Sequence, residues 1–192
     1  IINGRILGIA GVVGCDNPKV GGGATTTELV RELIANNILV LQTGCAAIAG
    51  ACGSLMVPEA AQYAGDGLRE VCEAVGMPPV LHCGSCVDNS RLLTAASGIV
   101  RAGGLGEDIS DLPLVGVAPG WMSEKAISIG HYFVASGVFT IFGVGLPVTG
   151  GPEFSQYLTE GIAEDYKGKW AISPDPATVA PQVVDHVQAK RQ

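Results

Sequence analysis

Short apolar runs alternate with longer amphipathic stretches along most of the chain. The runs are rich in Val, Ile and Leu and are apolar at successive positions, which is typical of parallel strands covered on both faces. They predict strands at Ile6–Val13, Ile38–Gln42, Val80–Cys83, Leu114–Ala118, Val138–Phe142 and Trp170–Ile172.

Apolar residues at helical spacing lie between these runs. They predict helices at Thr26–Asn36, Gly67–Val75, Asn89–Arg101, Ser123–Ser136 and Pro176–Ala189. The Asp-Pro pair that opens the last helix is a typical helix start, and Ser123 is a candidate N-cap. The alternation predicts an α/β fold with a doubly wound, mostly parallel sheet in three layers, α/β/α. We expect Gly21–Gly23 to be a flexible spot and Gly145–Gly151 to be a loop.

The composition narrows the class of protein. The 192 residues are 47% hydrophobic and only 15% charged, with 28 Gly, which excludes a disordered chain and a coiled coil. A net charge of -7 argues against a nucleic-acid partner, because the phosphate backbone attracts a basic face. We find neither an apolar run of about 18 residues nor a signal-peptide pattern. We therefore expect a cytoplasmic protein, with membrane association only through partners.

Three of the six cysteines directly follow strands of the predicted sheet. These are Cys15, Cys45 and Cys86, and each has a Gly one or two residues before it. Because ligands of open α/β sheets bind at the carboxyl ends of the strands, the three thiols can converge on one bound group. Three thiolates suit a soft metal centre, above all an iron–sulfur cluster, although isolated core cysteines are an equal alternative.

The remaining cysteines have simpler interpretations. We expect Cys52 and Cys72 to be small hydrophobic core residues. Cys83 ends a strand and is expected to pack, although the Cys-x-x-Cys spacing with Cys86 also fits a redox dithiol or half of a zinc site. A closed zinc site lacks a second such pair. The sparse cysteines indicate a reducing compartment rather than a disulfide scaffold.

Lys125 is the other candidate for chemistry. It lies at the start of a predicted helix beyond a strand, where a low-dielectric pocket would let it donate a proton or a hydrogen bond. A solvated lysine paired with an acid such as Glu124 is the alternative. His82 is expected to be a core histidine, and His131 and His186 to be structural. Asp88, Asn89, Ser90 and Arg91 are expected to cap the helix after Cys86.

Five segments carry a resemblance to a known family: Gly11–Lys19, Thr43–Ala47, Pro78–Arg91, Ser123–Ala126 and Leu146–Gly150. In order and over nearly the whole chain, the sequence resembles the anaerobic nickel–iron carbon monoxide dehydrogenases. The run Gly-Ser-Cys-Val-Asp-Asn-Ser-Arg is the most specific part. The likeness is to the C-terminal third of the catalytic subunit, so residues 1–192 are expected to form one Rossmann-like domain of a longer protein.

The resemblance implies an activity and a site. The family interconverts CO and water with CO2, two protons and two electrons at a nickel–iron–sulfur cluster. Cys15, Cys45 and Cys86 match three of the family's cluster ligands, and Cys86 matches the one bound to nickel. Lys125 matches the lysine thought to hydrogen-bond the oxygen of bound CO or CO2. A His and two Cys that complete the cluster come from an upstream domain.

The resemblance also implies partners and leaves two alternatives. Further 4Fe-4S clusters lie upstream in the family, electrons pass to a carrier such as ferredoxin, the subunit forms a homodimer, and some members join an acetyl-CoA synthase. Asp16 and Cys83 stand where many members carry Asn and Met, and Asp16 is also found in the related hybrid-cluster hydroxylamine reductases. The third hypothesis is an inert fragment that binds metal through three thiols. We expect no CO turnover by the 192 residues alone.

Overall fold

A single parallel sheet forms the centre of the molecule. The computed structural model describes residues 1–145 and 150–191. The strands are β1 (Gly8–Val12), β2 (Ile38–Gln42), β3 (Val80–His82), β4 (Leu114–Ala118), β5 (Phe139–Phe142) and β6 (Lys169–Ile172). They lie in the order β3-β2-β1-β4-β5-β6 and every neighbouring pair is parallel. The order reverses between β1 and β4, which confirms the doubly wound prediction.

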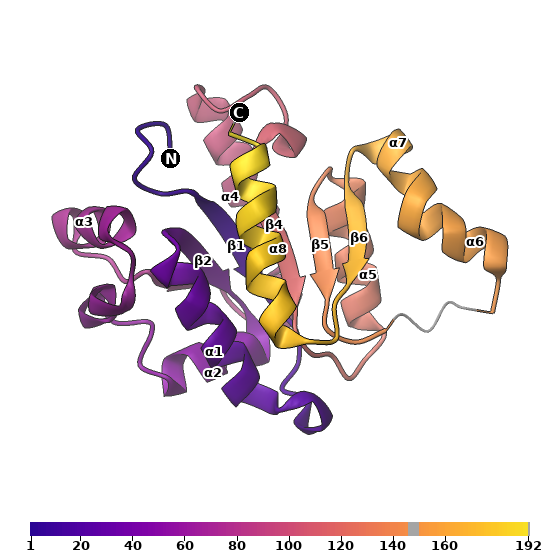
Figure 1. The fold of residues 1–192 in the computed structure, drawn as a ribbon, viewed down its shortest axis with the longest axis horizontal. Coiled ribbons are helices and arrows are strands. Elements are labelled where there is room, and N and C mark those ends of the chain that lie inside the picture. Colours follow the sequence, from indigo (N-terminus) through magenta and orange to yellow (C-terminus); the bar gives the residue numbers. More distant parts are fainter. Residues whose placement is uncertain (146–149, 192) are drawn as a thin grey trace.

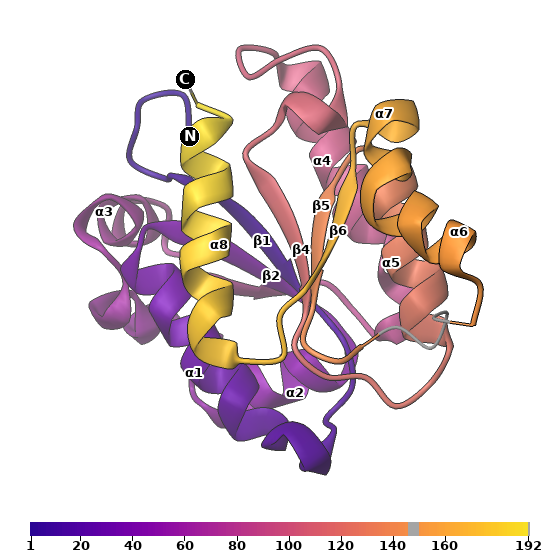
Figure 2. The ribbon, with the colours of Figure 1, turned by 45° about the vertical axis from the view of Figure 1, so that its right-hand side comes forward.

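Helices cover both faces of this sheet (Figures 1 and 2). They are α1 (Gly22–Ala35), α2 (Gly44–Cys52), α3 (Asp66–Val75), α4 (Ser90–Ala102), α5 (Lys125–Ala135), α6 (Pro152–Gln156), α7 (Ile162–Tyr166) and α8 (Pro176–Ala189). Short 3-10 helices are η1 (Pro18–Val20), η2 (Pro58–Tyr63), η3 (Cys86–Asp88) and η4 (Ile109–Asp111), and η5 (Tyr157–Gly161) is a π-helix. Within the described ranges, no helix is long and apolar enough to cross a membrane.

The helices divide into two layers. Helices α1 and α8 lie on one face of the sheet, whereas α4 and α5 lie on the other (Figure 2). The two chain ends lie side by side at the edge where β1 begins, and the Arg191 guanidinium donates to the carbonyl of Ile6 at 2.7 Å. The loops at the carboxyl ends of the strands therefore leave the opposite edge of the sheet.

Some boundaries differ from the predictions for local reasons. Helix α1 begins at Gly22, because Gly21 and Gly22 take the positive φ values of 85° and 55° that start it, so the run expected to be a flexible spot lies at a helix start. Helix α2 was not predicted, because its Gly- and Ala-rich sequence has no polar–apolar period. The segment α6–η5–α7 was also missed. Most of the predicted 145–151 loop, residues 146–149, lies outside the described residues.

Candidate metal centre

The three predicted cysteines line one cavity at the carboxyl end of the sheet. Cys15 follows β1, Cys45 lies in the first turn of α2 after β2, and Cys86 begins η3 after β3. Since β1, β2 and β3 are neighbours in the sheet, their loops leave it side by side. The cavity has a volume of about 350 Å³ and is also lined by Lys125.

The Cys15 loop is held against the loop that follows β4. The amide of Cys15 donates to the carbonyl of Gly120 at 2.9 Å, and the side-chain amide of Asn17 donates to the carbonyl of Trp121 at 3.0 Å. Gly14 has a φ of 111°, and a Cβ there would collide with the Gly120 carbonyl oxygen. Glycine is therefore required next to Cys15, as the sequence suggested.

The Cys86 turn is fixed by its own polar residues. The Asp88 carboxylate accepts from the amide of Ser85 at 2.8 Å and from its hydroxyl at 2.9 Å, and these bonds lower the pKa of Asp88. Arg91 forms an ion pair with Asp88 at 3.2 Å. Gly84 has a φ of 125°, and a Cβ there would lie 2.6 Å from the Asp88 carboxylate. The bonds between Ser85 and Asp88 form a capping box on η3, which holds the turn that carries Cys86. The helix that was expected to be capped, α4, has no side-chain cap hydrogen bond at Asn89, so that part of the prediction is wrong.

Lys125 lies at the start of α5, as predicted, and its ammonium approaches Cys86. Its Nζ lies 3.9 Å from the Sγ of Cys86, and its amide donates to the hydroxyl of Ser123 at 3.3 Å. None of the ion pairs formed by the described residues includes Lys125. Lys125 is exposed, as in the alternative of a solvated lysine, but among the described residues it has Cys86 rather than an acid beside its ammonium.

The other cysteines lie outside the cavity lining. Cys72 is buried in the core as predicted, and burial raises the pKa of its thiol. Burial also raises the pKa of Cys83, which keeps that thiol protonated and fits the packing interpretation. Cys52 was expected in the core, but it is exposed, because it ends α2 at the surface.

The histidines do not join the candidate site. His82 was expected in the core, but it is exposed because it ends the short edge strand β3, and its Nδ1 accepts from the amide of Gly84 at 3.0 Å. His131 packs against Trp170 with ring centroids 5.6 Å apart, and His186 packs against Phe139 at 4.8 Å. The structural roles expected for these two are confirmed.

The donor set fits an iron–sulfur cluster by its chemistry, because three thiols line one cavity. Among residues 1–145 and 150–191, no three His, Cys, Asp or Glu side chains are arranged to hold one metal ion. Cys15, Cys45 and Cys86 all line a cavity of about 350 Å³. Thiolates are the ligands of iron–sulfur clusters, which fill more space than one ion. Cys15, Cys45 and Cys86 could therefore hold such a cluster from one side.

The sequence did not indicate the apolar half of this cavity. Its wall includes Ile129 and Phe133 of α5, Phe142 of β5, and Met122 from the loop before α5. Their pattern is that of ordinary core residues, so no local signal separates them from packing positions. Together they give the site a low-dielectric wall in which charged groups interact strongly.

Comparisons with known proteins identify what the chain is similar to. Residues 1–177 match the model of the Prismane/CO dehydrogenase family. "Carbon monoxide dehydrogenase 1" of Methanosarcina mazei is 53% identical over 192 residues, which are 100% of this chain and 30% of that protein.

Two solved structures share the fold. One is the as-isolated, Ni-free carbon monoxide dehydrogenase of Thermococcus sp. AM4 produced without the CooC maturase, with 49% identity and a TM-score of 0.93 over 99% of this chain and 30% of that one. The other is carbon monoxide dehydrogenase IV of Carboxydothermus hydrogenoformans, with 43% identity and a TM-score of 0.94 over 100% of this chain and 31% of that one. The chain thus spans about 30% of the length of the relatives it matches.

Proposed function

The chain belongs to the Prismane/CO dehydrogenase family, and from this premise we propose that it forms one side of the active site of a carbon monoxide dehydrogenase. In this proposal Cys15, Cys45 and Cys86 bind a nickel–iron–sulfur cluster, with Cys86 on the nickel side. The observation that carries the proposal is that three thiols from neighbouring strand ends line one cavity with the ammonium of Lys125. A solved relative described as Ni-free without its maturase supports nickel as part of the site.

Lys125 has a specific task in this proposal. The bound cluster supplies the redox chemistry that interconverts CO and water with CO2, two protons and two electrons. Lys125 holds its protons at Nζ and donates a hydrogen bond to the substrate oxygen on which negative charge develops. Its 3.9 Å approach to Cys86 brings that donor to the nickel-side ligand.

The apolar wall contributes by excluding water. Phe133 of α5 and Phe142 of β5 are both buried and line the cavity. Beside this apolar wall, the interaction between the exposed Lys125 ammonium and a carboxylate-like substrate is less screened than in bulk water. The chain thereby contributes both a cationic donor and a medium in which that donor is effective.

The rest of the active protein lies beyond these residues in the proposal. Further cluster ligands and electron-transfer clusters are supplied by an upstream part of the subunit, and electrons leave through a carrier such as ferredoxin. The homodimer, the acetyl-CoA synthase partner and the assignment of residues 1–192 as one C-terminal domain stay predictions. We expect no CO turnover by the 192 residues alone.

Metal analysis of the full-length protein that carries this chain tests the proposal. Anaerobically purified protein is expected to contain nickel and iron and to reduce viologen in the presence of CO. Iron without nickel, together with hydroxylamine reduction, would replace the proposal by a hybrid-cluster-type reductase. Absence of both metals and of turnover would leave an inert thiol-bearing domain.

A further inference from the structure

A buried hydrogen-bonded bridge joins the loops of Cys45 and Cys86. The Thr43 hydroxyl donates to Oδ1 of Asn89 at 2.5 Å, and Nδ2 of Asn89 donates to the carbonyl of Cys86 at 2.9 Å. Thr43 is 1% exposed and Asn89 is 5% exposed, although Asn89 also lines the cavity. Thr43 belongs to the loop after β2, whereas Asn89 follows η3, so the bridge spans two segments distant in the sequence.

The direction of each bond follows from the chemistry of the groups. The Cys86 carbonyl can only accept, so the NH2 group of Asn89 must face it. Oδ1 of Asn89 therefore faces Thr43, and the Thr43 hydroxyl must donate. A side chain that lacks either the acceptor or the donor cannot make both bonds, so Asn at position 89 and a hydroxyl at position 43 are matched.

The two loops also touch through their backbones. The Gly44 amide donates to the carbonyl of Gly84 at 3.0 Å, and a Cβ at Gly44 would lie 3.2 Å from the Cβ of Cys86. Gly44 directly precedes Cys45 and has a φ of 56°. Little space is thus left between the Cys45 and Cys86 loops, and the bridge of Thr43 and Asn89 is the polar side-chain connection that sets how they meet.

We infer that Thr43 and Asn89 are positioning residues that fix the Cys45 and Cys86 thiols relative to each other. The inference rests on the proposed function for its consequence in the enzyme, because outer-shell hydrogen bonds orient metal ligands. Loss of the bridge leaves a buried polar group without its partner, and the loops then move to satisfy it. Thr43 and Asn89 thus control the spacing between the Cys45 and Cys86 thiols and are not ligands themselves.

Thr43→Val tests this in the anaerobic full-length protein, because it keeps the shape and removes only the hydroxyl donor. We expect nickel content or CO oxidation to fall about 10- to 100-fold, with an altered electron paramagnetic resonance spectrum of the cluster. Thr43→Ser restores the donor and should restore all three. Thr43→Val with the parent's spectrum and nickel content overturns the inference, whereas a parent that lacks nickel and iron overturns the proposed function.

Thr27→Val is the matched control. The Thr27 hydroxyl donates to the carbonyl of Gly23 at 2.8 Å and to that of Ala49 in α2 at 3.3 Å. Thr27→Val therefore weakens the contact between α1 and α2 at residues that do not line the cavity. It should match the parent. If it alters the spectrum as strongly as Thr43→Val, general loosening of α2 explains both results and the inference is wrong.

A second arm needs no cluster. Dibromobimane, which joins two neighbouring thiols, is applied to metal-stripped protein, and the Cys45–Cys86 bridge is mapped by mass spectrometry. We expect bridging in the parent and in Thr27→Val, and bridging about 10-fold slower in Thr43→Val, because the thiols lose their mutual orientation. Asn89→Asp, which places a carboxylate oxygen against the Cys86 carbonyl, should be equally slow. Equal rates in parent and variants, or no bridge in the parent, overturn the inference.

Discussion

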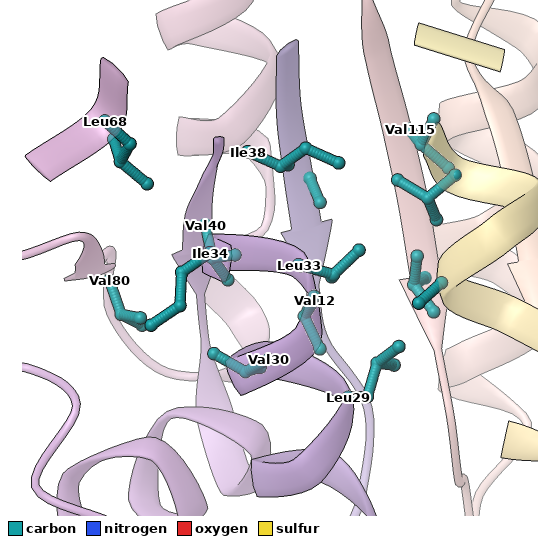
Figure 3. Close-up of a cluster of buried hydrophobic side chains, with 14 of the residues drawn as sticks. Val12, Leu29, Val30, Leu33, Ile34, Ile38, Val40, Leu68, Val80 and Val115 are labelled. Atoms are coloured by element: carbon teal, nitrogen blue, oxygen red, sulfur yellow. The ribbon is translucent and has the colours of Figure 1, made fainter. Parts of the chain in front are cut away.

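The two faces of the sheet are packed differently. On the face covered by α1 and α8, side chains such as Val12 and Ile38 of the sheet and Leu33 of α1 are fully buried and pack together (Figure 3). Under α5, on the opposite face, a cavity of about 350 Å³ remains between the helix and the strand ends. One sheet therefore carries a close-packed side, which stabilises the fold, and a hollow side, where the cysteines and Lys125 meet.

The difference separates stability from chemistry in space. In a close-packed interior, each side-chain atom that a substitution removes costs packing contacts on all sides. A side chain in a cavity wall already borders empty space, so its truncation costs fewer contacts. The thiols extend from loops that are anchored by glycines and backbone bonds, such as Gly14 beside Cys15. Substitutions on the hollow face should therefore change mainly the activity, whereas substitutions on the close-packed face should change mainly the free energy of unfolding.

The largest effect is expected on the hollow face. Cys86→Ala removes the proposed nickel-side thiolate, so CO oxidation and nickel content of the full-length protein should fall below detection. The free energy of unfolding of the chain should change by less than about 0.5 kcal/mol, because Cys86 is exposed. Cys52→Ala, an exposed cysteine outside the cavity, is the control and should retain full activity. Retained nickel in Cys86→Ala would refute the ligand assignment.

The next effect should distinguish the faces by stability. Leu33→Ala, at a fully buried position of α1, should lower the free energy of unfolding by about 3 to 5 kcal/mol. Ile129→Ala, in the wall of the cavity, should lower it by about 1 kcal/mol, because Ile129 is only partly buried. Urea unfolding of the chain measures both. Similar losses at the two positions would mean that the cavity face is packed as tightly as the other.

Lys125→Gln removes the ammonium charge and should lower turnover without destabilising the fold. Removing one preorganised donor costs about 10²- to 10³-fold in turnover, and the exposed lysine should contribute little to stability. We expect the loss in the CO oxidation rate with unchanged metal content. Lys19→Gln, an exposed lysine of η1, is the matched control. Normal turnover in Lys125→Gln would remove this residue from the mechanism.

The smallest effect is a pH response of the packed face. Burial beside Phe139, with Lys169 and Lys190 nearby, lowers the pKa of His186 from 6.5 to about 4. Between these values the unfolded chain binds the proton that the folded chain excludes, so stability is present above pH 6.5 and falls as the pH drops toward 4. Allowing for solvent screening of a half-buried ring, the loss is about 2 kcal/mol.

Urea unfolding at a series of pH values tests this response. His186→Gln should flatten the curve between pH 6.5 and 4, because the titrating ring is gone. The carboxylates Asp88 and Asp111, whose pKa values are lowered by backbone hydrogen bonds, lose their contribution only at still lower pH. A variant curve as steep as that of the parent would assign the response to another group.

Much of the arrangement could be predicted because it depends on local pattern. Strand runs such as Ile38–Gln42 and the Gly-Cys pairs that follow strands mark the sheet and its functional edge. The exposed positions of Cys52 and His82 could not be predicted, because their neighbours in sequence are apolar and only the packing of α2 and β3 decides their exposure. The apolar wall around Phe133 was missed for the same reason.

The sequence by itself determined the alternation of strands and helices along the chain, the parallel sheet that this alternation builds, and the three thiols at strand ends. It could do so because periodicity and turn chemistry are local properties. Only the tertiary structure decided that α5 leaves a cavity, that Lys125 approaches Cys86, and that Thr43 meets Asn89. These contacts join residues far apart along the chain, and their geometry follows from how strands and helices pack, which no local pattern specifies.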